Sequence, residues 1–221
     1  YLVTVAIDDF EMVTETGPEG LPIRNFFPKD VADMARVDFG GTADMIAFFS
    51  ETFGPYPFEA YGVVVADTRL GFALETQTLS LFSRDSISGQ ALDEETVAHE
   101  LAHQWFGNSV SLAEWPDIWL NEGFATYASW LWFEHSEGAE TLRGVIYQVY
   151  DYVAHQGSTV GLLPPGNPPR SDLFNYGVYL RGGLTLHALR ERVGDEIFFK
   201  IIRVYYDRFA YGNATTEDFI A

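Results

Sequence analysis

The chain has no cysteine among its 221 residues. This absence excludes disulfide cross-links and the cysteine-rich ligand sets that structural zinc sites favour. Basic residues are scarce as well, since 13 Lys and Arg stand against 32 Asp and Glu, for a formal net charge of −19. That sign argues against nucleic-acid binding, because phosphate backbones attract basic surfaces. No apolar run is long enough to form a transmembrane helix.

What is present is the composition of a folded globule. Hydrophobic residues make up 47% of the chain and aromatic residues 16%, which favours a packed core over disorder. The pattern predicts an α+β fold, in which a small N-terminal β-sheet is followed by a mainly helical region. Strands are expected at residues 1–13, 61–66 and within 70–81, and loops at 17–28 and 161–169. Helices are expected at 42–53 (with Thr42 as N-cap), 93–106, 119–135, 138–155, 175–193 and 195–209.

A His-Glu-x-x-His segment, formed by His99, Glu100 and His103, lies on one of the expected helices. Positions four apart share a helix face with Cβ atoms about 5–6 Å apart, so both imidazoles can reach one small cation. Glu100 flanks that cation without having to ligate it. This is the arrangement of a zinc hydrolase with a general base beside the metal. The other histidines lack a partner at ligand spacing and are expected to be structural or exposed: His135, His155 and His187.

Glu122 is the candidate third ligand. It lies on the expected helix 119–135 among apolar neighbours, where an unpaired carboxylate is destabilising and a metal ion would compensate for its burial. Three protein ligands leave one position open for water, as in catalytic zinc sites. We therefore expect one Zn²⁺ ion held by His99, His103 and Glu122, although other divalent ions can occupy such ligands.

Two segments together closely resemble the aminopeptidase N family. They are His99–Asn108 (HELAHQWFGN) and Trp119–Ala125 (WLNEGFA), with eighteen residues between His103 and Glu122. That family belongs to the gluzincins, zinc peptidases with two His and one Glu as ligands and a thermolysin-like catalytic domain. The resemblance implies that residues 1–221 form a thermolysin-like catalytic domain.

Two further family elements have counterparts here. Phe72–Thr76 (FALET) matches a Gly-x-Met-Glu-Asn segment, which implies that Glu75 binds the free amino terminus of the substrate. Phe72 and Thr76 replace the Gly and Asn of the family, which leaves the shape of the first specificity pocket open. Tyr179–Gly182 (YLRG) matches Tyr-x-Lys-Gly with Arg for Lys, which implies that Tyr179 stabilises the oxyanion. Tyr176 is the alternative for this role.

The resemblance implies a zinc-dependent aminopeptidase that hydrolyses the N-terminal peptide bond of peptides, with Glu100 as general base acting on the attacking water. Two alternatives stay open: another gluzincin hydrolase (an endopeptidase or an epoxide hydrolase) and a non-catalytic peptide-binding module. The expected partner is a peptide with a free N-terminus. The oligomeric state is not determined by the sequence.

Both ends of the chain interrupt an expected element. Residues 1–13 begin in mid-strand, and Thr215 or Thr216 caps a helix that has barely begun when the chain ends. We therefore expect an excised domain, with the end of a preceding β domain at about residues 1–13 and a following helical domain missing. The compartment, cytoplasmic or exported, stays open.

Overall fold

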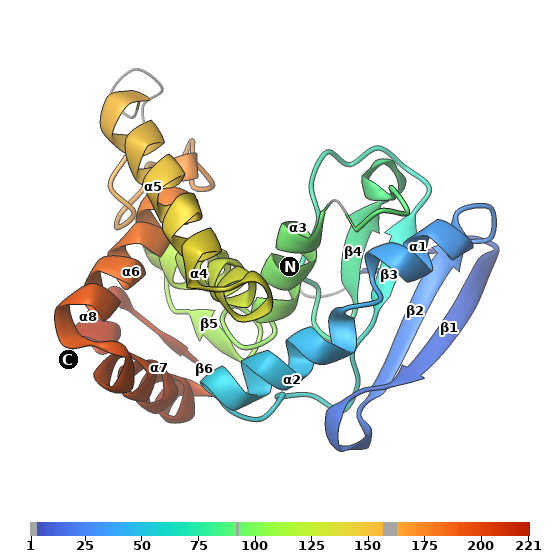
Figure 1. Cartoon of the computed structure of the whole chain (residues 1–221), viewed down its shortest axis with the longest axis horizontal. Coiled ribbons are helices and arrows are strands. Elements are labelled where there is room, and N and C mark those ends of the chain that lie inside the picture. Colours follow the sequence, from blue (N-terminus) through green and yellow to red (C-terminus); the bar gives the residue numbers. More distant parts are fainter. Residues whose placement is uncertain (1–3, 92, 157–162) are drawn as a thin grey trace.

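The computed structural model describes residues 4–91, 93–156 and 163–221. A four-stranded sheet lies at one side of the molecule and most of the helices lie at the other, with α3 (Glu94–Ala102) between them (Figure 1). This arrangement confirms the predicted order of a small sheet followed by a mainly helical region.

The sheet has the strand order β1-β2-β3-β4. Its strands are β1 (Phe10–Thr16), β2 (Pro22–Pro28), β3 (Val63–Ala66) and β4 (Ser80–Ser83). The β1–β2 pair is antiparallel, whereas β2–β3 and β3–β4 are parallel. The three valines of β3 are all buried, as expected for a strand covered on both faces. Gly62 precedes β3 where the chains approach so closely that a Cβ atom would lie 1.8 Å from the Arg24 carbonyl oxygen.

The helical part surrounds α4 (Trp119–Glu137), whose residues from Trp119 to Trp132 are all buried. Because neighbours cover it on nearly every side, its sequence is apolar around the helix instead of along one stripe. The other α-helices in the described part of the chain are α1 (Ala32–Asp38), α2 (Thr42–Phe53), α5 (Ala139–Gln156), α6 (Gly182–Val193), α7 (Asp195–Phe209) and α8 (Thr216–Ile220). A five-residue π-helix, η4 (Gly177–Arg181), leads into α6, and a second small sheet pairs β5 (Val110–Leu112) with β6 (Gly212–Ala214). No helix of the described residues is both long and apolar enough to span a bilayer.

Several predicted elements match the structure closely. Helices α2 and α7 have the predicted bounds, and α4, α5 and the η4–α6 segment agree to within two residues at each end. Thr215 caps α8 through a reciprocal capping box with Asp218. Thr42, by contrast, is not the N-cap of α2. The cap position is Gly41, and the Thr42 hydroxyl donates to the Phe39 carbonyl instead (2.7 Å).

Two strand predictions and one loop prediction are wrong in their bounds. The first strand begins at Phe10, residues 4–9 are irregular, and the predicted loop 17–28 contains β2. The prolines that suggested a loop lie at the two ends of β2, where a missing N–H is tolerated. In the predicted strands within 70–81, only Leu74 forms a bridge, to Leu81, before β4 begins at Ser80. Part of the predicted loop 161–169 lies outside the described residues.

Helix α3 ends at Ala102, four residues before its predicted end. After the His103 C-cap, the N–H groups of Gln104 and Trp105 bond to carbonyls three residues back, both at 3.0 Å. This tightening closes the helix, and Gly107 then turns the chain with a φ of +138°, a conformation that favours glycine.

Asp38, at the end of α1, anchors the segment that leads into α3. Its carboxylate accepts the N–H groups of four consecutive residues, Ser88 to Ala91, at 2.7–3.0 Å, and the Ser88 hydroxyl at 2.9 Å. Burial raises the pKa of Asp38, but the N–H groups of Gly89, Ala91 and Ser88 outweigh burial and hold the pKa below its usual value. The ionised carboxylate therefore stabilises the fold.

We expect Asp38→Asn to lower the free energy of unfolding by about 1–3 kcal/mol at pH 7, because an amide offers these N–H groups fewer acceptors and no charge. The folded-state pKa of Asp38 is depressed, so its contribution is present above about pH 4 and is lost as the pH falls through the folded pKa. Denaturant titration at pH 7 and at pH 3 measures this. The matched control is Asp207→Asn on an exposed surface of α7, expected within about 0.5 kcal/mol of wild type. A difference between wild type and Asp38→Asn that persists undiminished at pH 3 would refute the linkage.

Candidate active site

The end of α3 presents three functional side chains. His99 and Glu100 lie in its last turn, and His103 follows at the C-cap with helical backbone angles (φ −59°, ψ −20°). The imidazoles of His99 and His103 therefore stay on one face even though the regular helix ends at Ala102. Their ring centroids are 4.7 Å apart.

Glu122, in the first turn of α4, brings its carboxylate to the same point. The Nε2 atoms of His99 and His103 are 3.1 Å apart, and Glu122 Oε2 lies 3.3 Å from the first and 3.2 Å from the second. Among the described residues, these three form the one group with metal-ligating geometry. The structure thus brings together the three residues that the sequence predicted as ligands.

This donor set fits a tetrahedral divalent ion. Ligand bonds of about 2.0–2.1 Å place the ligand atoms of a tetrahedron about 3.3–3.4 Å apart, close to the three separations observed. Two imidazole nitrogens and one carboxylate oxygen are also a ligand set of catalytic zinc sites, with a fourth position left for water.

The tautomer of His103 suits metal binding. Its Nδ1 lies 2.9 Å from the Phe106 carbonyl oxygen. Because a carbonyl only accepts, Nδ1 carries a hydrogen, and Nε2, which faces His99 and Glu122, is the nitrogen that can ligate a metal ion once its own proton is displaced. Backbone carbonyls that orient ligating histidines in this way are typical second partners at metal sites.

The protein's own charges attract a cation here. Burial lowers the pKa of His103, but the charges of Glu122 and Glu75 outweigh burial and raise the pKa to about 10. Burial raises the pKa of Glu122, but the charge of His103 and its hydrogen bond outweigh burial and lower the pKa to about 2. His99 differs, because burial lowers its pKa. Without a metal ion, these carboxylates therefore keep a proton on His103, and a divalent ion can take the place of that proton.

Glu100 lies beside this group and is almost fully buried. Burial raises its pKa well above the usual value of a glutamate, against the opposing charge of His103. Its Oε2 atom is buried and has no hydrogen-bond partner among the described residues. A buried acceptor without a partner is rare in folded proteins and points to a missing water or ligand.

Tyr179 contacts the ligand cluster formed by His99, His103 and Glu122, whereas Tyr176 is largely exposed. The Tyr179 ring is stacked on the His99 ring, with centroids 6.0 Å apart and planes 23° apart. Burial, followed by the charges of Glu122 and Glu75, raises the pKa of the Tyr179 phenol, so its hydroxyl stays a hydrogen-bond donor at neutral pH. Tyr176 is 70% exposed. The geometry favours Tyr179 as the tyrosine next to the ligands.

Glu75 is buried next to the same site. It follows Leu74, whose backbone bridges to Leu81. Its charge raises the pKa of both Glu100 and His103, which places its carboxylate within electrostatic reach of these groups. The two positions that depart from the family segment behave differently: Phe72 is 60% exposed, whereas Thr76 is buried and its hydroxyl donates to the Leu79 carbonyl.

Two polar side chains that the sequence analysis did not single out hold the Glu75 segment. Asn108 Nδ2 donates to the Glu75 carbonyl oxygen at 2.7 Å. Gln104 Oε1 accepts the Thr78 N–H at 2.9 Å. Both follow His103 closely in the chain, and both are buried. Their signal in the sequence is that they are polar residues inside a largely apolar stretch.

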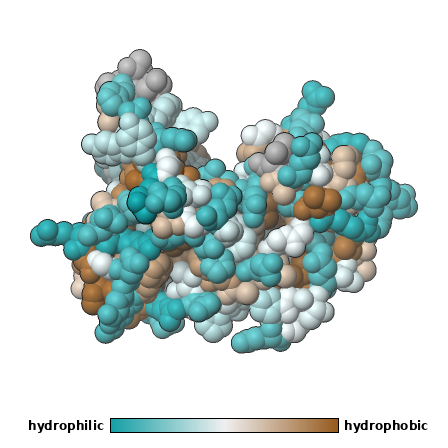
Figure 2. Space-filling model, in the orientation of Figure 1, coloured by the Kyte–Doolittle hydropathy of each residue, from teal (hydrophilic) through white to brown (hydrophobic). Residues whose placement is uncertain are grey.

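The ligand cluster is open to solvent on the His99 side. The His99 side chain is 15% exposed, against 1% for His103 and 5% for Glu122. In the same orientation as Figure 1, the surface is hollowed between the helical part and the sheet part (Figure 2). The remaining histidines lie outside the cluster: His135 is stacked on Phe48, His187 contacts the Tyr127 hydroxyl and His155 is exposed.

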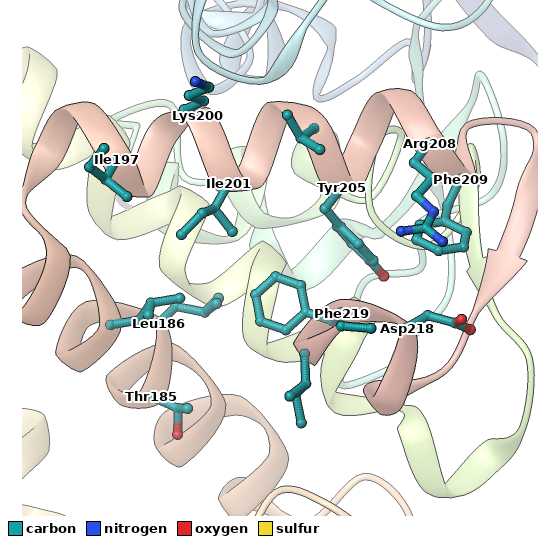
Figure 3. Close-up of a pocket in the computed structure, with 14 residues that line it drawn as sticks. Thr185, Leu186, Ile197, Lys200, Ile201, Tyr205, Arg208, Phe209, Asp218 and Phe219 are labelled. Carbon is teal, nitrogen blue, oxygen red and sulfur yellow. The ribbon is translucent and has the colours of Figure 1, made fainter.

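A second hollow, of about 750 Å³, lies between α6, α7 and α8 (Figure 3). Its lining is mainly apolar, as with Leu186, Ile201 and Phe219, and its charged groups are Lys200, Arg208 and Asp218. None of the ligand-cluster residues lines it. It therefore offers no arrangement for hydrolytic chemistry comparable with that around His99.

Comparison with known proteins agrees with this geometry. The family model described as the Peptidase family M1 domain matches residues 37–221. The chain belongs to peptidase family M1. Its relatives include aminopeptidase N of Canis lupus familiaris, 31% identical over 99% of this chain and 24% of that protein. Aminopeptidase M1 of Arabidopsis thaliana is 27% identical over 99% of this chain and 26% of that protein. The chain thus spans about a quarter of the length of these M1 relatives.

Solved M1 structures share the fold. A mutant of the M1 zinc metallopeptidase of Deinococcus radiodurans superposes with a TM-score of 0.78 at 33% identity, covering 96% of this chain and 47% of that one. A mutant of the same enzyme bound to a Tyr-Ser-Ala substrate gives a TM-score of 0.77 at 35% identity, over 95% of this chain and 46% of that one. The thermolysin-like gluzincin fold of the M1 catalytic domain is therefore confirmed for this chain.

Proposed function

We propose that this chain is the catalytic domain of a zinc aminopeptidase. The observation that carries the proposal is the convergence of His99 Nε2, His103 Nε2 and Glu122 Oε2. Beside them is a buried Glu100 carboxylate oxygen that has no hydrogen-bond partner within the described part of the chain. The M1 relatives support it, since they are named aminopeptidases and the solved neighbours are zinc metallopeptidases.

His99, His103 and Glu122 would hold the zinc ion. When bound, zinc acts as a Lewis acid toward the peptide carbonyl and makes water a stronger acid. Glu100 takes a proton from the attacking water while the water oxygen bonds to the carbonyl carbon, and it passes that proton to the amine nitrogen when the C–N bond breaks. The Tyr179 hydroxyl donates a hydrogen bond to the developing oxyanion without carrying charge itself.

Glu75 would bind the α-ammonium of the substrate and so confine cleavage to the first peptide bond. Its buried carboxylate is held beside the site by the Asn108 hydrogen bond to its backbone. Neighbours of known structure support this substrate class: mutants of a two-domain M1 zinc metallopeptidase have been solved bound to L-tryptophan and to L-arginine. A mutant of the Deinococcus radiodurans enzyme has been solved with the substrate Tyr-Ser-Ala.

The first test is the zinc content of the purified protein, together with aminoacyl-anilide hydrolysis on the same sample. We expect one zinc ion per chain and turnover that a chelator removes. No zinc after incubation with the ion would contradict the metal site. Turnover of amino-blocked peptides at the rate of free ones would contradict the aminopeptidase assignment and favour an endopeptidase.

We expect Glu75→Gln to raise KM for substrates with a free amino group by about 10–100-fold, because a hydrogen bond to a charged group contributes about 1.5–3 kcal/mol. Steady-state kinetics on free and amino-acetylated anilides measures this, and only the free substrate should be affected. Glu137→Gln, at an exposed position at the end of α4, is the matched control. An unchanged KM for free substrates would remove Glu75 from amine binding.

A further inference from the structure

Two glycines form a close backbone contact between α4 and the segment that carries Tyr179. A methyl group on Gly123 would lie 2.9 Å from the Cα atom and 3.1 Å from the carbonyl carbon of Gly182, and 3.2 Å from the Val178 carbonyl oxygen. A methyl group on Gly182 would lie 2.8 Å from the Gly123 Cα atom. These are backbone atoms on both sides, so no side-chain rotation can relieve the overlap.

Backbone conformation does not explain these glycines. Gly182 has helical angles (φ −59°, ψ −53°) that any residue adopts, and Gly123 lies within the regular helix α4. Glycine is a poorer helix former than alanine in such positions. The lack of a side chain is therefore needed for the close contact itself.

The contact joins two parts of the proposed catalytic machinery. Glu122, a candidate zinc ligand, immediately precedes Gly123 on α4. Tyr179 lies three residues before Gly182, in the π-helix η4, and its ring is stacked on His99. The ligand and the tyrosine therefore lie on the two elements that meet at this contact, so the separation of the two backbones affects the distance between the two side chains.

Close contacts fix the position of η4 at both of its ends. A methyl group on Gly177, its first residue, would lie 2.2 Å from the Leu163 carbonyl oxygen, and the Gly177 N–H donates to Asn175 Oδ1 at 2.9 Å. A methyl group on Gly183, just beyond Gly182, would lie 2.8 Å from the Trp130 ring. Single π-turns are often found at functional sites, and this one cannot slide or withdraw without losing these contacts.

We propose that Gly123 and Gly182 are positioning residues, whose backbone contact holds the Tyr179 hydroxyl at catalytic distance from the metal ligands. The inference rests on the proposed role of Tyr179 as oxyanion donor. A displacement of about 1 Å in a catalytic group can lower the rate by about 100-fold. Separating the two backbones by one added methyl group would therefore be sufficient to slow the reaction.

The test compares Gly182→Ala, Tyr179→Phe and the double variant in the purified zinc-loaded protein. We expect Gly182→Ala to lower kcat by about 10–100-fold, with one zinc ion retained and KM within about 2-fold of wild type. Its affinity for a phosphinate peptide analogue, measured by calorimetry, should fall by the same factor, whereas affinity for a free amino acid should not. The double variant should be no slower than Tyr179→Phe alone, because the glycine acts through that hydroxyl.

Gly144→Ala is the matched control, since Gly144 lies in helix α5 with nothing within 4 Å of the added methyl group. It should leave kcat, zinc content and Tm unchanged or raise Tm slightly. Gly123→Ala approaches the same contact from α4 and serves as the second variant if Gly182→Ala does not fold.

Three outcomes would overturn the positioning role. They are unchanged kcat in a folded Gly182→Ala, losses that multiply in the double variant, and failure of both glycine variants to fold, which would assign the contact to stability alone. Failure of the proposed function is a separate result, because it shows as missing zinc or missing turnover in the wild-type protein.

Discussion

Glu100→Gln is expected to lower kcat by about 10²–10⁴-fold while the protein keeps its zinc, because an amide of the same shape cannot take the proton from water or return it to the amine. At Glu100, a loss of turnover can be separated from a loss of zinc. It lies one residue after His99, yet it is not one of the three converging ligand atoms, and one of its oxygens has no partner among the described residues. Metal analysis and steady-state kinetics on the same preparation measure the two effects independently.

The matched control for this variant is Glu95→Gln, an exposed position on the same helix α3. It removes one carboxylate of the helix without approaching the ligands, so both kcat and zinc content should stay near wild type. Substantial turnover in Glu100→Gln would contradict the assignment of this residue as the general base. Loss of zinc in that variant would instead show that Glu100 acts in metal binding.

Glu122→Gln is expected to weaken zinc binding by more than about 100-fold. Removing a residue that only hydrogen-bonds a metal ligand already weakens metal binding by about 10–100-fold. The neutral amide is a poor ligand, and it also removes the charge that balances the cation in a buried pocket. Turnover should fall in proportion to bound zinc and return in part at high zinc concentration. Competition with a chelating dye measures the affinity, with Glu137→Gln on the same helix as control.

Zinc affinity equal to wild type in Glu122→Gln would contradict the ligand assignment. Thermal unfolding adds an independent readout. Zinc should raise the Tm of the wild-type protein through its preference for the folded state, and this increment should be much smaller in the variant at the same zinc concentration.

Much of the ligand cluster could be predicted because its geometry is local. His99 and His103 are one helical turn apart, so a periodicity of 3.6 residues is sufficient to place both rings on one face. Glu122 could be predicted from its apolar neighbours, since a buried carboxylate needs compensation. Its position opposite the two histidines, at 3.2–3.3 Å, depends on the packing of α4 against α3.

Other features could not be predicted because they join residues far apart in the chain. Asp38 binds a loop fifty residues later, and nothing near it in the sequence indicates such a partner. The sequence predicts a loop where β2 lies, because Pro22 and Pro28 are turn signals, whereas their place at the strand ends depends on pairing with β1 and β3. Gln104 and Asn108 are assigned to the Glu75 segment only by their hydrogen bonds.

The sequence by itself determined the class of chemistry: the types of ligand, the base beside them and the family to which the chain belongs. These follow from side-chain chemistry and from spacing along single helices, which short-range geometry controls. Only the tertiary structure decided that the Tyr179 ring stacks on His99, how the Glu75 segment is held and why there is no room for a side chain at Gly123 and Gly182. Each of these is a distance between separate elements, and such distances depend on how the whole core packs.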